Sequence, residues 1–78
     1  MEYGLGQLVI CLKGKEKGRL MCIVGADEKF IYLADGRERP LGRPKKKNPK
    51  HARLTGKSIS NMFPLTDKTL RKILLSEV

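Results

Sequence analysis

The sequence predicts a small, mainly β protein: an antiparallel barrel followed by one C-terminal α-helix. The first half of the chain consists of short apolar segments, rich in β-branched residues, that alternate with glycine-containing turns. Short strands joined by tight turns are typical of small antiparallel barrels. Near the C-terminus, the spacing of the apolar residues changes from a strand period to a helical period. The chain has 78 residues, which is enough for one domain with a modest core.

Three strands are predicted in the first half of the chain. Residues 7–13, QLVICLK, form a β-rich run short enough for a strand that is buried on much of both faces. Residues 19–24, RLMCIV, are expected to pair with it as a hairpin across the loop at 14–18, GKEKG. The third strand, 30–34, reads FIYLA and is followed by an Asp-Gly turn. The Tyr32 ring should face outward, where it either packs at a loop or stacks on a base.

The middle of the chain is predicted to contain only short extended pieces, at 37–41 and 50–54. The intervening segment, 42–49, contains two prolines. It is expected to be irregular or to lie at a sheet edge, because proline cannot donate a hydrogen bond to a strand ladder. Residues 55–64 are polar and turn-prone, which predicts a linker.

The last segment is predicted to be an amphipathic helix of about three turns. Leu70, Ile73 and Leu74 fall at i, i+3 and i+4 behind a cap at Thr66 or Asp67. We expect this apolar face to cover the open end of the barrel; docking on a partner protein is the alternative. The predicted units are a barrel at 1–57 that includes a basic arm at 39–57, a linker at 58–65 and a helix at 66–78.

The strongest functional feature is a positively charged segment. The chain carries 17 Lys and Arg against 8 Asp and Glu, a net charge of +9, and residues 39–57 hold eight of these cations and no acidic residue. Because crowded like charges oppose folding, the segment is expected to bind a polyanion, and nucleic acid is the commonest one. Charge by itself does not separate RNA from DNA.

Membrane attachment and metal binding are not expected. Prolines and glycines interrupt residues 39–57, so no continuous amphipathic helix can carry the charge there. The N-terminal apolar run is too short for a signal peptide or a membrane span. Cys11 and Cys22 lie in apolar runs and are predicted to be buried thiols in a reducing cytoplasm. Together with His51 they lack the spacing of a zinc site.

No enzymatic activity, cofactor or small-molecule substrate is predicted. The single histidine, His51, has no cysteine or carboxylate in its local run. Residues 55–58, TGKS, imitate the end of a phosphate-binding loop, but that motif requires a glycine where the chain has His51. The loop at 14–18 has two interpretations. Its glycines let backbone N–H groups approach a ligand, or it is a hairpin tip kept soluble by its lysines.

Three blocks of the sequence resemble the KOW motif of ribosomal and transcription-factor proteins. The resemblance is greatest to the archaeal and eukaryotic large-subunit KOW proteins and to their small bacterial relatives. The first block is Gly6-x-x-Val9 followed by KGxxKGR at 13–19. The second is DxxFIxLxxG at 27–36, and the third is RPKKKNxKHxxLT at 43–55. Three blocks in this order are more specific evidence for a KOW motif than the glycine-lysine loop alone.

The resemblance implies an SH3-like barrel that binds structured RNA, with ribosomal RNA and the large ribosomal subunit as the expected partners. It implies contact regions in the first hairpin loop and in the basic arm. The implied contact residues are Lys13, Lys15, Lys17, Arg19, Lys45, Lys46, Lys47, Lys50 and His51, and the predicted site also includes Arg43 and Arg53 of the same arm.

The expected function is therefore non-catalytic RNA binding through phosphate contacts, in which recognition rests largely on backbone shape. The alternative is a protein-interaction module that docks on the ribosome or on the transcription machinery.

Overall fold

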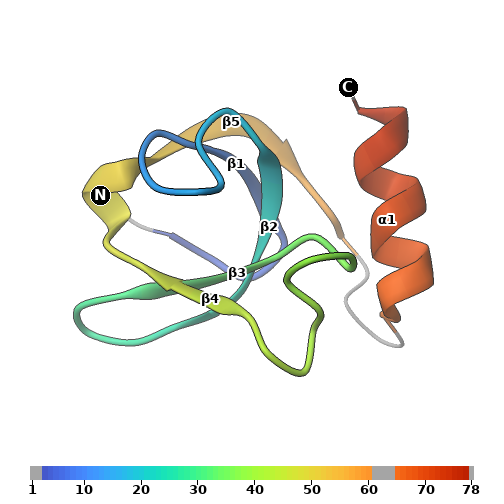
Figure 1. The fold of residues 1–78 in the computed structure, drawn as a ribbon, viewed down its shortest axis with the longest axis horizontal. Helices are drawn as coiled ribbons and strands as arrows, with labels where there is room; N and C mark the ends of the chain where they lie inside the picture. The colour runs from blue at the N-terminus through green and yellow to red at the C-terminus, as the bar shows by residue number, and fades with distance from the viewer. Residues whose placement is uncertain (1–2, 61–64, 78) are drawn as a thin grey trace.

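The chain forms five antiparallel strands and one C-terminal helix, in a computed structural model that describes residues 3–60 and 65–77 (Figure 1). The order of strands in the single sheet is β4-β3-β2-β1-β5. The mainly β fold class with a terminal helix is thereby confirmed. The elements are β1 (Gln7–Cys11), β2 (Leu20–Ala26), β3 (Ile31–Ala34), β4 (Lys45–Lys47), the 3-10 turn η1 (Pro49–His51), β5 (Ala52–Ser58) and α1 (Asp67–Ser76).

Strands β1, β2 and β3 bury side chains on both faces, as predicted for the first of them. Alternate residues point to opposite faces of a strand, so one set fills the inside of the curled sheet and the other packs under α1. The inner cluster consists of Val9, Cys11, Met21, Ile23, Ile31, Leu33 and Ala52. The outer cluster consists of Leu8, Cys22, Ala34, Leu70 and Leu74.

The sheet curls into a small barrel that is consistent with the SH3-like fold. Strands β4 and β5 are its two edges, and η1 joins them directly along the chain. Irregularities in the ladders increase the twist of a sheet. One lies between Ile23 and Gly25, and another lies beside Gly56, whose φ is +84°.

Three expectations for the middle of the chain were wrong in detail. Residues 37–41 form no strand, because the Asp35 carboxylate accepts the N–H groups of Arg37 and Arg39 and bends the chain back. The last strand begins at Ala52, after the turn η1, rather than at residue 50. Residues 55–58, expected in a linker, belong to β5. Residues 61–64 of that predicted linker lie outside the described residues.

Helix α1 begins where the sequence predicted it. Thr66 is the cap: its Oγ1 accepts the N–H of Thr69 at 3.1 Å. Leu70 and Leu74 are buried, so the prediction that this face packs on the barrel is confirmed. The helix covers the outer face of β1–β3, however, rather than an open end (Figure 1). None of the helices within residues 3–60 and 65–77 is long and apolar enough to cross a membrane.

Both cysteines are free and buried, as predicted. Burial raises the pKa of the Cys11 thiol and raises that of Cys22 to about 11. The Cys11 Sγ lies 3.4 Å from Met21 Sδ in the inner cluster. Both thiols therefore behave as small apolar side chains rather than as reactive groups.

The N-terminal end of α1 is held by the loop between β3 and β4. Asp67 Oδ1 accepts the N–H of Leu41 at 2.7 Å, and Arg71 Nη1 donates to the Gly36 carbonyl at 2.7 Å. Gly36 is buried with a φ of +77°, and a Cβ added there would lie 2.3 Å from the Asp67 carbonyl oxygen. Only glycine permits this approach.

We expect Gly36→Ala to destabilise the fold much more than Gly18→Ala. Both residues have a positive φ, which costs a residue with a Cβ about 1–2 kcal/mol. A Cβ at Gly18 meets nothing within 4 Å, whereas one at Gly36 collides with the backbone of α1. Urea denaturation of the two variants checks this, and equal losses would show that α1 moves aside at no cost.

Candidate nucleic-acid interface

The loop between β1 and β2 turns its one acidic residue inward. Gly14 and Gly18 have φ angles of +86° and +85°, and the loop closes on itself: the N–H of Lys17 donates to the Gly14 carbonyl and the N–H of Gly18 to the Cys11 carbonyl. Glu16 is only 3% exposed, whereas Lys15 and Lys17 are exposed. The N–H groups of Lys17 and Gly18 are thus used within the loop, which weakens its interpretation as a backbone anion cradle.

The Glu16 carboxylate joins three segments of the chain. Its Oε2 accepts hydrogen bonds from Arg39 Nε at 2.9 Å and Nη2 at 2.7 Å. Lys47 Nζ lies 3.6 Å from Glu16 Oε1 and donates to the Lys13 carbonyl at 2.9 Å. Among the described residues, Oε1 has no hydrogen-bond partner. We call Glu16, Arg39 and Lys47 the charge cluster. It ties the first hairpin loop to the β3–β4 loop and to β4.

The charge cluster keeps Glu16 ionised. Burial disfavours the charged carboxylate, but the hydrogen bonds and positive charge of Arg39, with the charge of Lys47, outweigh it and lower the pKa of Glu16 below its usual range. At neutral pH the negative charge is therefore present and is balanced inside the protein. Sequence reasoning missed Glu16 and Arg39; the available signal was a single carboxylate in an otherwise basic, glycine-bounded loop.

Residues 45–47 lie at a sheet edge, one of the two alternatives predicted for this segment, but Lys47 is not the accessible contact residue that was expected. These residues form an edge strand in register with β3, and Lys47 lies opposite Ile31, a residue of the inner cluster. Side chains alternate along a strand, so Lys46 points outward and Lys47 inward, where it is only 7% exposed. Its ammonium is engaged by Glu16 and Lys13, and it is a structural residue rather than an accessible phosphate contact.

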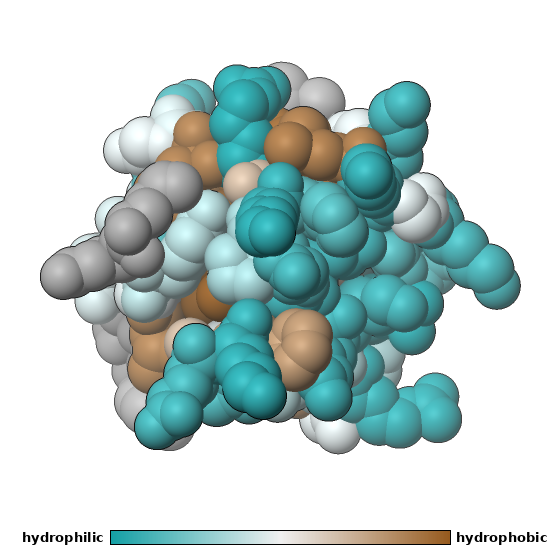
Figure 2. Space-filling view, turned by 90° about the vertical axis from the view of Figure 1, so that its left-hand side faces the viewer, coloured by the Kyte–Doolittle hydropathy of each residue, from teal (hydrophilic) through white to brown (hydrophobic). Residues whose placement is uncertain are grey.

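Four exposed lysines belong to two adjoining segments, the first hairpin loop with its flank and η1. The N–H of Leu12 donates to the His51 carbonyl at 2.8 Å, which holds the loop against that turn. Figure 1 places both segments on the side of the barrel away from α1, and Figure 2 shows that this side is mostly hydrophilic. We call the exposed residues Lys13, Lys15, Lys17 and Lys50 the lysine face. His51, half-buried, lies beside them.

The other predicted site residues lie elsewhere on the surface or are already engaged. Arg19 forms an ion pair with Glu38, and Lys46 Nζ lies 4.4 Å from the centre of the Phe30 ring. Arg53 is opposite Ile10 in the β1–β5 ladder, which places it on the outer face of the sheet. Arg43 is exposed in the loop before β4, and Lys45 is half-buried. The structure therefore brings together only part of the predicted set.

The Tyr32 ring faces outward, as predicted, but its hydroxyl is engaged. It donates to Asp27 Oδ2 at 2.6 Å, and this bond raises the pKa of Tyr32 and lowers that of Asp27. The ring also lies against Gly25, where a Cβ would contact it at 3.6 Å. Packing beside the β2–β3 turn thus accounts for this aromatic residue.

No protein-family model matches the chain, and no curated protein matches it in sequence. The KOW resemblance is therefore limited to three short sequence blocks. A function has to be inferred from the chemistry of the surface.

We expect Lys47→Gln to unfold the protein more readily while Lys46→Gln has little effect. Removing one partner of a buried ion pair costs about 2–3 kcal/mol when the carboxylate keeps a second cation. An exposed lysine changes stability by less than about 0.5 kcal/mol. Urea denaturation of the two neighbouring variants makes the comparison, and equal stabilities would contradict a structural role for Lys47.

The charge cluster also predicts a pH dependence. Because the pKa of Glu16 is lower in the folded state, its contribution to stability is present above its usual value of 4.5 and is lost as the pH falls through the folded value. The free energy of unfolding of the wild type should exceed that of Glu16→Gln at pH 7, and the gap should narrow toward pH ~3. Denaturation at both pH values and constant ionic strength measures the gap. A gap that does not change with pH would contradict this role.

Proposed function

We propose that this protein binds structured RNA without catalysing a reaction, with ribosomal RNA as the natural candidate. The observation that carries the proposal is the lysine face. Three of the four exposed lysines lie in or directly before a loop whose only acidic residue is buried and neutralised, and the fourth lies in the adjoining turn η1. No carboxylate within residues 12–19 is therefore left on the surface to reduce the local positive potential.

The chemistry of this surface suits a phosphate backbone. Lysine ammonium groups are mobile point charges that neutralise phosphates and release counterions, which gives affinity without sequence specificity. A-form RNA hides its base edges in a deep, narrow major groove, so a compact basic surface recognises backbone shape. The half-buried His51 beside Lys50 adds a hydrogen-bonding group at the same place.

In this fold the apolar face of α1 is buried, so it is not available to dock on a partner protein. Leu70 is fully buried and Leu74 is 6% exposed, both against the protein's own sheet. We also propose a ribosomal location and a large-subunit partner, because three blocks of the sequence resemble the KOW proteins of that subunit.

The lysine face predicts a steep dependence of RNA affinity on salt. If about five phosphates are neutralised, log K should fall with log salt at a slope of about −3.5 to −4.5. The double variant Lys15→Gln/Lys17→Gln removes two contacts, so its slope should be shallower by about 1.5. Fluorescence anisotropy with an RNA hairpin, and with a DNA hairpin of the same sequence, measures the slopes and the preference for RNA.

The matched control is Lys68→Gln/Lys72→Gln, which removes the same charge from two exposed residues of α1. The control should keep the wild-type slope, and both double variants should melt near the wild type because exposed charges contribute little to stability. A wild-type slope shallower than about −1, or equal effects of the two double variants, would overturn the proposal.

A further inference from the structure

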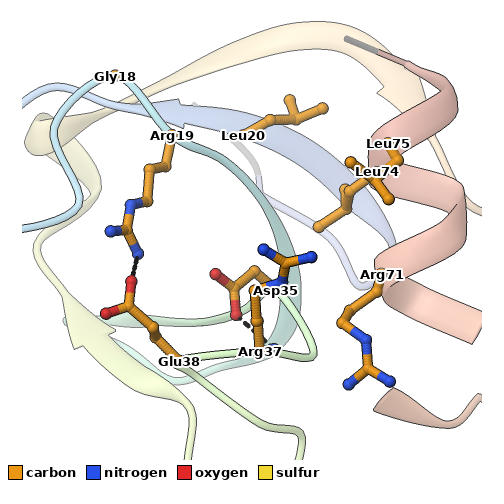
Figure 3. A pocket seen from close by; sticks show the side chains of 9 residues that line it. All are labelled: Gly18, Arg19, Leu20, Asp35, Arg37, Glu38, Arg71, Leu74 and Leu75. Atoms are coloured by element: carbon orange, nitrogen blue, oxygen red, sulfur yellow. Dashed lines mark hydrogen bonds and ion pairs between the residues drawn. The ribbon is translucent and has the colours of Figure 1, made fainter. Parts of the chain in front are cut away.

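A groove lies between the first hairpin, the β3–β4 loop and α1. It has a volume of about 440 Å³, within the range of small-ligand sites. Figure 3 shows the two different ends of this groove: Arg19 faces Glu38 at one end, and the leucines from β2 and α1 gather at the other. Its lining residues are Gly18, Arg19, Leu20, Asp35, Arg37, Glu38, Arg71, Leu74 and Leu75.

Positive charge prevails in the groove, because three arginines line it with only two carboxylates, and both carboxylates are already engaged. Asp35 Oδ1 accepts two N–H groups of its own loop, and Glu38 pairs with Arg19. Arg37 is exposed, and its guanidinium has no hydrogen-bond or ion-pair partner among residues 3–60 and 65–77. An anionic group entering the groove therefore meets an available arginine.

The Arg19–Glu38 pair can open at small cost. Its two side chains are 45% and 62% exposed, and exposed ion pairs contribute at most about 1 kcal/mol. A phosphate can therefore replace the Glu38 carboxylate on Arg19, since arginine binds both groups through the same planar donors. Arg19 thereby becomes available when a polyanion is present.

The apolar end of the groove offers a surface for a flat ring. Leu74 is buried beneath it, while Leu75 is 65% exposed, one of the most exposed large apolar residues in the described chain. An exposed leucine in the same groove as the unpaired guanidinium of Arg37 suits a ligand that is both aromatic and anionic. Unpaired nucleotides fit this description, because proteins bind splayed bases by stacking them on aromatic side chains or on arginine planes. Arg37 provides the plane in this groove, and Leu75 provides an apolar contact.

We propose that this groove holds one unpaired nucleotide of the bound RNA, with its base against Leu75 and Arg37 and its phosphate on Arg19. The groove shares Gly18 and Arg19 with the hairpin that carries Lys15 and Lys17, so one RNA molecule can occupy both. The inference rests on the proposed function and adds to it a preference for RNA with a bulged or looped-out nucleotide.

The test compares an RNA hairpin carrying a single bulged adenosine with the same hairpin fully paired. The wild type should bind the bulged hairpin at least about fivefold more tightly, a modest gain for one stacked base. In Arg37→Gln/Leu75→Ser this ratio should fall to about one. The matched control, Lys29→Gln/Leu5→Ser, removes one exposed cation and one exposed leucine outside the groove and should keep the ratio.

The outcomes separate this inference from the proposed function. If the wild type binds both hairpins equally, or if the groove and control variants have the same ratio, the nucleotide site is wrong while RNA binding stands. If neither hairpin binds, both proposals fail. A short peptide rich in Glu and Leu serves as a third probe. If the groove variant loses that peptide but keeps its preference for the bulged hairpin, the groove is a protein-docking site and the inference is overturned.

Discussion

The buried Glu16 carboxylate is the interaction on which the closure of this barrel depends. Removing a carboxylate from water costs several kcal/mol unless cations and hydrogen bonds replace its solvation. Arg39 provides two hydrogen bonds and Lys47 a second positive charge, and these residues come from different loops and strands. The first hairpin loop, the β3–β4 loop and the edge strand β4 must therefore all be in place before the charge is stable.

The same interaction shapes the surface. Inside the loop GKEKG, the burial of the middle residue leaves its two neighbouring lysines to face solvent. Concentrated positive charge destabilises a compact state, and an exposed Glu16 would have relieved it. The fold instead places the only negative charge of the loop where it cross-links the barrel. Structural stability and a positive exterior thus come from one arrangement of charges.

The helix is as much a part of the core as the strands are. A sheet with only one covered face would leave Leu8, Cys22 and Ala34 in water, and α1 covers them with Leu70 and Leu74. The contact of Gly36 with the first turn of α1, together with the hydrogen bonds from Arg71 and to Asp67, fixes where the helix docks. The docked helix also forms one wall of the groove between the first hairpin, the β3–β4 loop and α1. A segment outside the KOW-like blocks therefore contributes to the surface that we propose for RNA.

The sequence by itself determined the features that depend on near neighbours. The first three strands, the hairpin, a helix cap at Thr66 or Asp67, the apolar face of the helix and the buried cysteines all follow from periodicity, turn residues and composition. The tertiary structure alone decided which of the cations remain available. Lys46 and Lys47 are adjacent and chemically identical, yet the pairing of β4 with β3 sends one outward and the other to Glu16. Register and long-range ion pairs join residues that are distant in the chain, and no local pattern encodes them.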